Sequence, residues 1–263
     1  FHYTAGSWIQ FGLDIDGESV GEFFGVSVSL SSDGSVVAVG GSGTNANTGL
    51  ARVYAYSSGT WTKLGIDIVG ESVGEYFGVS VSLSSDGTTV AVGGSGTNAN
   101  TGLVRVFHYT TGSWSQFGLD IDGESTGEYF GVSVSLSSDG SILAVGAYGA
   151  NSNMGLVRVY AYLSGAWTQL GLDIDGESVG ETAGVSVSLS NSGSLVNIGA
   201  YGAHSYTGIT RVYQAPTYSP TVQPSQATCV PTANPVSQPQ HIPTAQPSQA
   251  TCVPTANPVS QPQ

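Results

Sequence analysis

FGVSVSLSSDGSVVAVGGSGTNANTGLARVYAY, residues Phe24–Tyr56, decides the fold, because close copies of this stretch begin at Phe77, at Phe130 and, with several changes, at Ala183. The tryptophans mark the interval, since they recur every 53 residues, at Trp8, Trp61, Trp114 and Trp167. A fixed period of about this length is typical of a solenoid, a propeller or another array of repeats. The chain is therefore expected to be a tandem array.

Each unit contains four short segments with the features of β-strands, separated by turn residues. Val26–Ser31 alternates apolar and small polar residues, and after a Ser-Asp-Gly turn Val36–Gly41 is a continuous apolar run, as in a strand covered on both faces. A polar loop follows, and then Leu50–Tyr56 and Thr60–Ile68 form the third and fourth segments. No segment shows a 3.6-residue period of useful length, so the sequence predicts an all-β chain.

Four antiparallel strands in about 50 residues, repeated in tandem, predict the blades of a β-propeller. A β-solenoid is the alternative, although its period would be roughly half as long. The strands suffice for four blades if the N-terminal segment SWIQFG, residues 7–12, completes the last blade and closes a ring. Closure would hide the sheet edges that otherwise invite aggregation. Without it, the four blades are an arc of a larger propeller. The chain opens in the middle of a repeat, which we interpret as a cut in a longer protein.

Composition divides the chain near Gln214. We assign residues 1–214 to the propeller and residues 215–263, which are rich in Pro, Thr and Ser, to a disordered stalk. QPSQATCVPTANPVSQPQ occurs twice in the stalk, and its frequent prolines disfavour both helix and sheet. An extended spacer open to O-glycosylation is expected. Cys229 and Cys252 could pair with each other, link to another chain or remain free.

The charge balance excludes a nucleic-acid partner, because the net charge is −13 and the chain has only five Lys and Arg residues. No apolar run is long enough for a transmembrane helix. Few lysines and many Gly, Ser, Thr and Asn residues favour an extracellular protein, secreted or held at the cell surface or wall.

Acidic residues occupy fixed places in the repeat. Asp33, Asp86 and Asp139 lie in the Ser-Asp-Gly turns, and the other 15 acids lie in the loops between the outer strand of one blade and the inner strand of the next. In a propeller these loops emerge on the same face as the polar loops that follow the second strands. The sequence therefore predicts one acidic face, on which the candidate ligand-binding residues are Asn45, Asn47, Asn98, Asn100, Asn151 and Asn153.

The motif Asp-x-Asp-Gly-Glu in these loops offers three oxygen ligands to Ca²⁺, a cation that takes six to eight. The alternative is a solvated loop whose charges keep a Gly-rich surface soluble. Val69 replaces the second Asp of the second unit, so that blade should bind Ca²⁺ least well. The candidate calcium ligands are Asp14, Asp16, Glu18, Asp67, Glu71, Asp120, Asp122, Glu124, Asp173, Asp175 and Glu177.

Two other residue types recur once per unit. Arg52, Arg105, Arg158 and Arg211 either form a cationic ring for an anionic ligand or pair with nearby loop carboxylates, and we predict the pairs because a charge on a packed strand needs a partner. The four tryptophans are either platforms for sugar stacking or core residues, and we predict core residues because Trp buries a large area.

Catalysis requires a unique, asymmetric group of acid, base and nucleophile. In this chain every notable polar group occurs three or four times at equivalent positions, and neither a Gly-x-Ser-x-Gly elbow nor a phosphate-binding loop is present. The sequence therefore predicts a protein that is not an enzyme. The fourth unit has Ala183 where the others have Phe, so its blade is expected to be the loosest.

Four motifs recur in order: Trp-x-x-x-Gly, Phe-Gly-Val-Ser-Val-Ser-Leu, Ala-Val-Gly-Gly or Val-Gly-Ala-Tyr-Gly, and Gly-Leu-Val-Arg-Val-Tyr. Over residues 8–213 this pattern resembles the FG-GAP repeats of integrin-α-like propellers. The resemblance implies a propeller, most often seven-bladed, in a secreted or cell-surface protein that binds other molecules. Two features differ: the proline of "GAP" is absent, and the family's Ca²⁺ loop is reduced to Ser31–Gly34 with one carboxylate.

These observations predict a non-catalytic extracellular module for binding or adhesion that uses its acidic loop face to hold a protein or glycan ligand. A structural matrix or wall component bridged by Ca²⁺ through the acidic loops is the alternative, and an enzyme is the third possibility. The sequence leaves the oligomeric state open.

Overall fold

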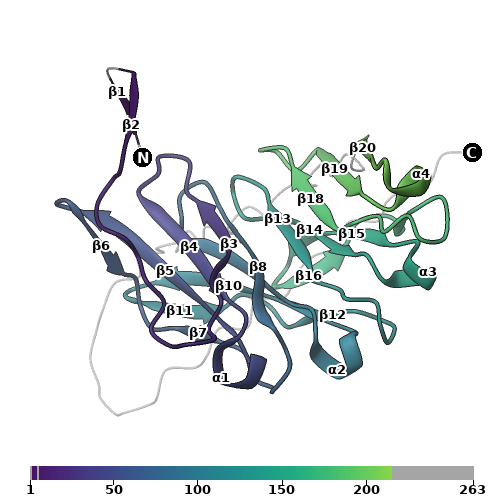
Figure 1. The fold of residues 1–263 in the computed structure, drawn as a ribbon, viewed down its shortest axis with the longest axis horizontal. Coiled ribbons are helices and arrows are strands. Elements are labelled where there is room, and N and C mark those ends of the chain that lie inside the picture. The colour runs from purple at the N-terminus through teal and green to yellow at the C-terminus, as the bar shows by residue number, and fades with distance from the viewer. Residues whose placement is uncertain (1, 5, 215–263) are drawn as a thin grey trace, which may run out of the picture. The chain divides into compact units, whose positions relative to one another are not determined.

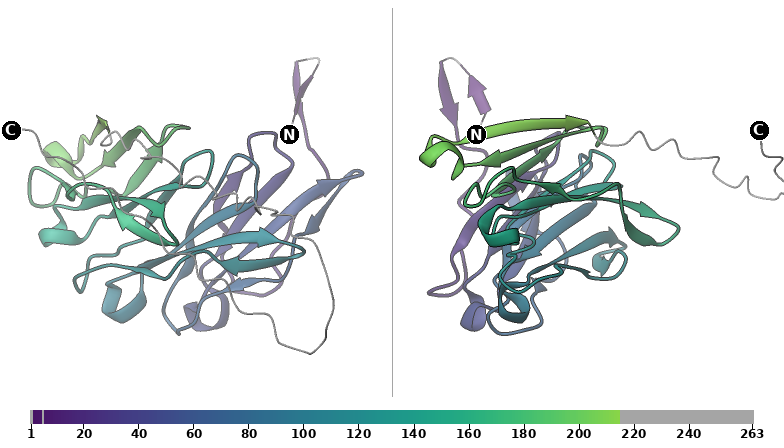
Figure 2. Two further views of the ribbon diagram at one scale, coloured as in Figure 1. Left: turned by 180° about the vertical axis from the view of Figure 1, so that it is seen from behind. Right: turned by 90° about the vertical axis from the view of Figure 1, so that its right-hand side faces the viewer.

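A computed structural model describes residues 2–4 and 6–214, and the predicted stalk with its two cysteines lies outside the described residues. The strands form four antiparallel sheets in chain order, which are the blades of a β-propeller (Figure 1). In both views of Figure 2 the colour changes steadily from the first blade to the fourth, so each blade lies beside its neighbours in sequence. The all-β propeller prediction is confirmed. No helix within the described ranges is long and apolar enough to cross a membrane.

Three blades share one topology, in which a fourth strand and a further two-residue strand both pair with the third strand. Blade 1 contains β3 (Phe24–Leu30), β4 (Val36–Gly41), β5 (Leu50–Ser57), β6 (Thr60–Lys63) and β7 (Ile68–Val69). Blade 2 contains β8 (Phe77–Leu83), β9 (Thr89–Gly94), β10 (Leu103–Thr110), β11 (Ser113–Gln116) and β12 (Ile121–Asp122). Blade 3 contains β13 (Ser133–Leu136), β14 (Ile142–Ala147), β15 (Leu156–Leu163), β16 (Ala166–Gln169) and β17 (Ile174–Asp175).

Blade 4 has only three strands among the described residues, β18 (Ser186–Leu189), β19 (Leu195–Ala200) and β20 (Ile209–Gln214). The N-terminal strand β2 (Ser7–Ile9) pairs with β1 (His2–Thr4) instead of β20. Ring closure by the N-terminal strand, the first of the two arrangements considered above, is therefore not what the structure shows. The four blades form an open series, with the edge of β20 unpaired within residues 6–214.

The polar loop after each second strand is wound into one tight turn: α1 (Thr44–Asn47), α2 (Thr97–Asn100), α3 (Ala150–Asn153) and α4 (Ala203–Tyr206). The turn is left-handed, because Asn45, Ala46 and Asn47 have φ of 49°, 56° and 64°. A left-handed conformation costs an L-residue roughly 1–2 kcal/mol, and Asn tolerates it best among residues other than Gly. Gly49 ends the turn where a Cβ would lie 2.0 Å from the carbonyl oxygen of Phe77, so the position requires glycine.

The core lies between consecutive blades. We call the side of a blade that faces its predecessor the front face, represented in blade 2 by Phe77, Val81 and Leu83. The opposite side is the back face, represented in blade 1 by Ala38, Ala51 and Val53. These six side chains form one buried cluster. Blades 2 and 3, and blades 3 and 4, repeat the arrangement.

The tryptophans join neighbouring blades at their outer edges. Trp114 is buried and donates its indole N–H to the carbonyl of Leu64 at 2.7 Å, and Trp61 and Trp167 donate in the same way to Phe11 and Phe117. Trp8 is largely exposed. The prediction of core tryptophans therefore holds for Trp114, holds in part for the two that are half-buried, and is wrong for Trp8, which no blade of the described residues covers.

Candidate functional site

A buried arginine lies at the centre of each loop cluster. The Arg52 side chain projects from the middle of β5 and is only 3% exposed. Its Nη1 donates to Glu22, its Nη2 lies 3.3 Å from Glu18, and its Nε donates to Asp67 at 2.9 Å. Glu18 and Glu22 precede β3, whereas Asp67 follows β6, so one guanidinium joins the loops at both ends of a blade. The carboxylates outweigh the effect of burial, which would lower the pKa of Arg52, and hold that pKa above its usual value.

The clamp recurs around Arg105 and Arg158, and around Arg211 it recurs without an aspartate among the described residues. Arg105 contacts Glu71, Glu75 and Asp120 at 3.2, 2.6 and 2.9 Å, and Arg158 contacts Glu124, Glu128 and Asp173 at 3.2, 2.5 and 3.0 Å. In the first three clamps the guanidinium also lies over a phenylalanine ring, at 5.3 to 5.5 Å from the ring centroid. The prediction that the arginines pair with loop carboxylates is confirmed.

One glutamate in each clamp is itself buried: Glu22, Glu75, Glu128 and Glu181. Glu75 illustrates the arrangement, since it accepts N–H groups of Glu71 and Ser72 at 2.8 and 2.9 Å on one oxygen and Arg105 on the other. These glutamates hold the acidic loop in shape, a role that our sequence analysis missed. Their constant spacing of 30 residues from the arginine is a signal that could have revealed it.

The structure accounts for most of the calcium candidates through this clamp. Asp67, Asp120 and Asp173 are bound to arginine, whereas Glu18, Glu71, Glu124 and Glu177 each touch an arginine from an exposed position. Asp14, Asp16, Asp122 and Asp175 contact no arginine within residues 6–214. Burial and the neighbouring Asp120 raise the pKa of Asp122. In the part of the chain that the structure describes, no three His, Cys, Asp or Glu side chains are placed to hold a metal ion. A calcium site stays a prediction.

The turns α1, α2 and α3, which we call the Asn turns, contact the acidic loop that leads into the next blade. The backbone N–H of Tyr76 donates to the carbonyl of Asn47 at 2.7 Å, and Asn47 Nδ2 donates to the Tyr76 hydroxyl at 3.3 Å. Asn100 and Tyr129 repeat both contacts, and Asn151 donates to Asp175 at 3.0 Å. The two kinds of loop thus lie together, as the sequence predicted. We call this surface the loop face.

The loop face also carries exposed apolar tips. Val20, Val73 and Val179 lie between the exposed and the buried glutamate of their clamps and are largely exposed. Asn45, Asn98 and Asn151 are exposed beside them, while Asn47 and Asn100 are half-buried. Each unit therefore presents a carboxylate, the first three units also present an amide, and three of the four units present a valine side chain.

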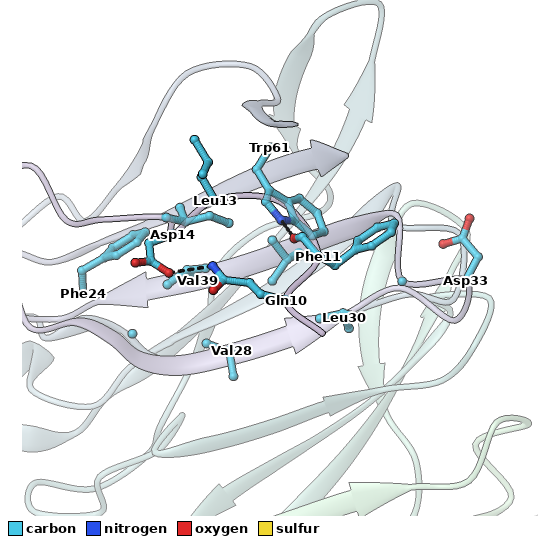
Figure 3. Close-up of a pocket in the computed structure, with 14 residues that line it drawn as sticks. Gln10, Phe11, Leu13, Asp14, Phe24, Val28, Leu30, Asp33, Val39 and Trp61 are labelled. Atoms are coloured by element: carbon cyan, nitrogen blue, oxygen red, sulfur yellow. Dashed lines mark hydrogen bonds between the residues drawn. The ribbon is translucent and has the colours of Figure 1, made fainter. Parts of the chain in front are cut away.

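A cavity of about 520 Å³ opens on blade 1 (Figure 3). Its walls are mostly apolar and include Phe24, Val28, Leu30, Val37, Val39 and Trp61. Gln10 and Asp14, joined by a 2.7 Å hydrogen bond, form its polar rim. The cavity lies on the front face of the blade, and the acidic residues of the loop face contribute only Asp14 to it.

No family model and no curated protein matches the sequence. Among solved structures, the chain is similar to a proposed 6-phosphogluconolactonase from Bacteroides uniformis, with 14% identity and a TM-score of 0.48 over 72% of this chain and 49% of that one. It is also similar to a proposed TolB from Agrobacterium tumefaciens, with 14% identity and a TM-score of 0.46 over 73% of this chain and 58% of that one.

Hydrazine synthase from Kuenenia stuttgartiensis is a third similar structure, with 17% identity and a TM-score of 0.49 over 71% of this chain and 57% of that one. The chain thus spans about half the length of the structures it matches. Likenesses of this strength say nothing about what the chain binds or does.

Proposed function

We propose that the protein is a non-catalytic binding module that holds a protein or glycan ligand on its loop face. The observation that carries the proposal is repetition: four clamps fix four similar acidic loops, and each loop exposes a glutamate beside an Asn turn or its equivalent. Equivalent sites on one surface favour a multivalent ligand, because binding at one site raises the effective concentration at the next.

Charge defines the class of ligand. Each complete clamp contains three carboxylates and one arginine, so the loop face keeps an excess of negative charge after every internal pair is formed. Such a surface attracts and orients a basic partner. A basic protein segment is therefore the favoured ligand, and the exposed valines offer it apolar contacts. Glycan hydroxyls, which bond to carboxylates and amides, are the second choice.

Features of the sequence support an extracellular location. The repeats resemble FG-GAP repeats, and low lysine content with a Pro/Thr-rich segment at residues 215–263 is typical of secreted or wall-associated proteins. We propose an extracellular module of that kind. The recurrence of the same arginine–glutamate pairs in all four units supports binding over catalysis.

A charge-neutral variant tests the proposal. Gln replaces all four exposed clamp glutamates together, Glu18, Glu71, Glu124 and Glu177. These substitutions remove the charge at the exposed position of each clamp and leave the buried glutamate in place. The control, Asp33→Asn with Asp86→Asn and Asp139→Asn, removes charge at the Ser-Asp-Gly turns instead. Both proteins and the wild type are applied at pH 7 to arrays of basic peptides and of glycans, with Ca²⁺ and with a chelator.

We expect wild type and the turn variant to bind the same array members, and the glutamate variant to lose at least about tenfold in affinity. Equal binding by all three proteins would place the ligand elsewhere and overturn the role of the loop face. Binding that vanishes with chelator in the wild type would support calcium at the loops.

A further inference from the structure

We propose that Tyr76, on the loop face of blade 2, is the docking site for an aromatic side chain of a protein ligand. The proposal rests on the function proposed above, because it names the side chain of the basic partner that one blade recognises. Blade 2 packs against blade 1 on one side and against blade 3 on the other, so the exposure of Tyr76 does not come from a missing neighbour.

The Tyr76 ring is fixed between two blades. Its hydroxyl accepts a hydrogen bond from Asn47 Nδ2 of α1 at 3.3 Å, and its ring lies against Gly96, where an added Cβ would be 2.5 Å from Tyr76 Cδ2. Gly96 directly precedes α2, so the ring bridges the turns of blades 1 and 2. Even so, Tyr76 is 40% exposed. The result is an aromatic surface that is held in place and partly open to solvent.

Blade 3 shows what such a surface accepts. Tyr129 is held as Tyr76 is, because Asn100 donates to its hydroxyl at 3.3 Å and an added Cβ on Gly149 would lie 2.7 Å from its Cδ2. In this blade a second ring, Tyr148, stacks on Tyr129, with the ring centroids 4.9 Å apart and the planes 12° from parallel. The surface of blade 3 therefore already carries a flat aromatic group.

Blade 2 lacks the second ring. Ser95 lies one 53-residue period before Tyr148, and within the described residues no aromatic ring stacks on Tyr76. A flat ring brought by a ligand can therefore take the place that Tyr148 fills in blade 3. Offset stacking of this kind is the arrangement that aromatic side chains prefer.

Blades 1 and 4 differ from blade 2. In blade 1 the Phe23 ring lies on Gly43 in the same way, and Ser42 stands where blade 3 has its second tyrosine. No blade of the described residues precedes Phe23, so we confine the proposal to Tyr76. In blade 4, Thr182 replaces the ring altogether.

The surroundings of Tyr76 favour a peptide as the carrier of the ring. Glu71 lies in the same loop with its side chain 69% exposed, and Val73 is 77% exposed. Three carboxylates surround Arg105 in this clamp, so negative charge remains in excess. A basic peptide gains from this charge, whereas a neutral sugar does not. A sugar ring is also puckered, whereas the group that blade 3 places on its tyrosine is flat.

Three synthetic peptides of equal net charge test the proposal. Each contains several lysines separated by glycine and serine, and a central position carries tyrosine, leucine or arginine. Isothermal titration calorimetry measures the binding of each peptide to the full chain at pH 7 in low salt. We expect the wild type to bind the tyrosine peptide about two- to tenfold more tightly than the leucine peptide, the effect of one aromatic pair.

Variants of the site separate the ring from its supports. Ser95→Tyr copies blade 3 and covers the Tyr76 ring without removing any group of the loop, and Ser95→Ala is its control. Tyr76→Leu removes the flat ring, whereas Tyr76→Phe keeps the ring and removes only the hydroxyl that Asn47 contacts. Tyr148→Ser uncovers the Tyr129 ring in blade 3. Circular dichroism checks that each variant is folded.

Ser95→Tyr and Tyr76→Leu should lower the ratio of the tyrosine-peptide affinity to the leucine-peptide affinity. Ser95→Ala and Tyr76→Phe should leave this ratio unchanged, and Tyr148→Ser should raise it. The affinity for the leucine peptide should be the same in every protein.

Three results would overturn the aromatic site and leave the basic partner intact. They are equal binding of the tyrosine and leucine peptides by the wild type, tightest binding of the arginine peptide, and a ratio that is the same in the wild type, Ser95→Tyr, Tyr76→Leu and Tyr148→Ser. Binding of none of the three peptides by the wild type would overturn the basic partner together with the aromatic site.

Discussion

Four buried glutamates make the arginines necessary. Glu75 is 0% exposed, and the Arg105 guanidinium compensates its charge. Removing one partner of such a pair leaves a charge in a dry site, which costs about 3–5 kcal/mol. At the scale of single residues, the clamps are thus interdependent sets that fail when one member is lost.

Arg105→Met should therefore lower the free energy of unfolding by about 3–5 kcal/mol in urea denaturation. Adding Glu75→Gln should recover part of the loss, because the uncompensated charge is then removed. Arg211→Met is the matched control, since the Arg211 side chain is 23% exposed and its clamp is incomplete. Because Glu181 is also buried and would lose its partner, we expect a loss here too, but a smaller one than at Arg105. Equal losses at the two arginines would contradict the role assigned to burial.

The turn aspartates set the response to acid. The backbone N–H of Ser35 and the hydroxyls of Ser31 and Ser35 hydrogen-bond to Asp33 and lower its pKa from 3.8 to about 2. At Asp86 and Asp139 burial would raise the pKa, but equivalent hydrogen bonds outweigh it and the pKa is lowered. Because the folded carboxylates release protons more readily than the unfolded ones, their contribution to stability is complete above about pH 4 and is lost as the pH falls toward 2.

We expect the free energy of unfolding to fall over that interval, and to fall less in the triple variant Asp33→Asn, Asp86→Asn, Asp139→Asn. Urea titrations at a series of pH values measure both curves. The triple variant should also be less stable at pH 7. Parallel curves for the two proteins would mean that other groups control the acid response.

Among the elements, the left-handed turns are the most strained. Ala46 and Ala99 have φ of 56° and 57° in α1 and α2, a region that glycine enters without steric cost. Ala46→Gly should therefore stabilise the protein by about 0.5–1 kcal/mol, the relief of strain exceeding the added chain entropy. Ala166→Gly, at an exposed site in β16, should instead destabilise it by a similar amount. Thermal or urea unfolding distinguishes the two, and destabilisation by Ala46→Gly would show that the turn is not strained.

Most elements could be predicted from the sequence, and the exceptions have physical causes. The apolar run Val36–Gly41 is β4 residue for residue, because continuous apolar runs leave little freedom of assignment. The predicted segment Thr60–Ile68 is instead two strands, β6 and β7, because Gly65 takes a φ of 79° between them. The turn α1 was expected only as a polar loop, since a string of Asn and Thr is compatible with many conformations.

The candidate site could be predicted only in part. Arginine–carboxylate pairing followed from the cost of burying a charge, but which acids are buried depends on tertiary structure. The same limit applies to Val28 and Val81, which occupy the same place in the identical sequence FGVSVSLSSDG. Val28 is 65% exposed, whereas Val81 is 7% exposed. Within the described residues only Val81 has a preceding blade to cover it, and the repeat sequence carries no information about that difference.

At the scale of the whole molecule, stability should decline toward blade 4. In blade 4, Ala183 replaces the phenylalanine that is buried in blades 2 and 3. Within residues 6–214, the clamp of blade 4 lacks an aspartate, and the back face of this blade is uncovered. We expect amide hydrogens of β19 and β20 to exchange faster than those of β9 and β10 in hydrogen–deuterium exchange. Uniform protection across the four blades would contradict this gradient.

The antiparallel register inside each blade governs how the protein yields to force. When Ser7 and Gln214 are pulled apart, tension reaches the strands one at a time and peels their hydrogen bonds in sequence rather than shearing them together. Each blade touches only its neighbours, so extension should proceed in steps of roughly 180 Å, the length of one 53-residue unit drawn taut. A chain built this way should lengthen at low load, one blade after another.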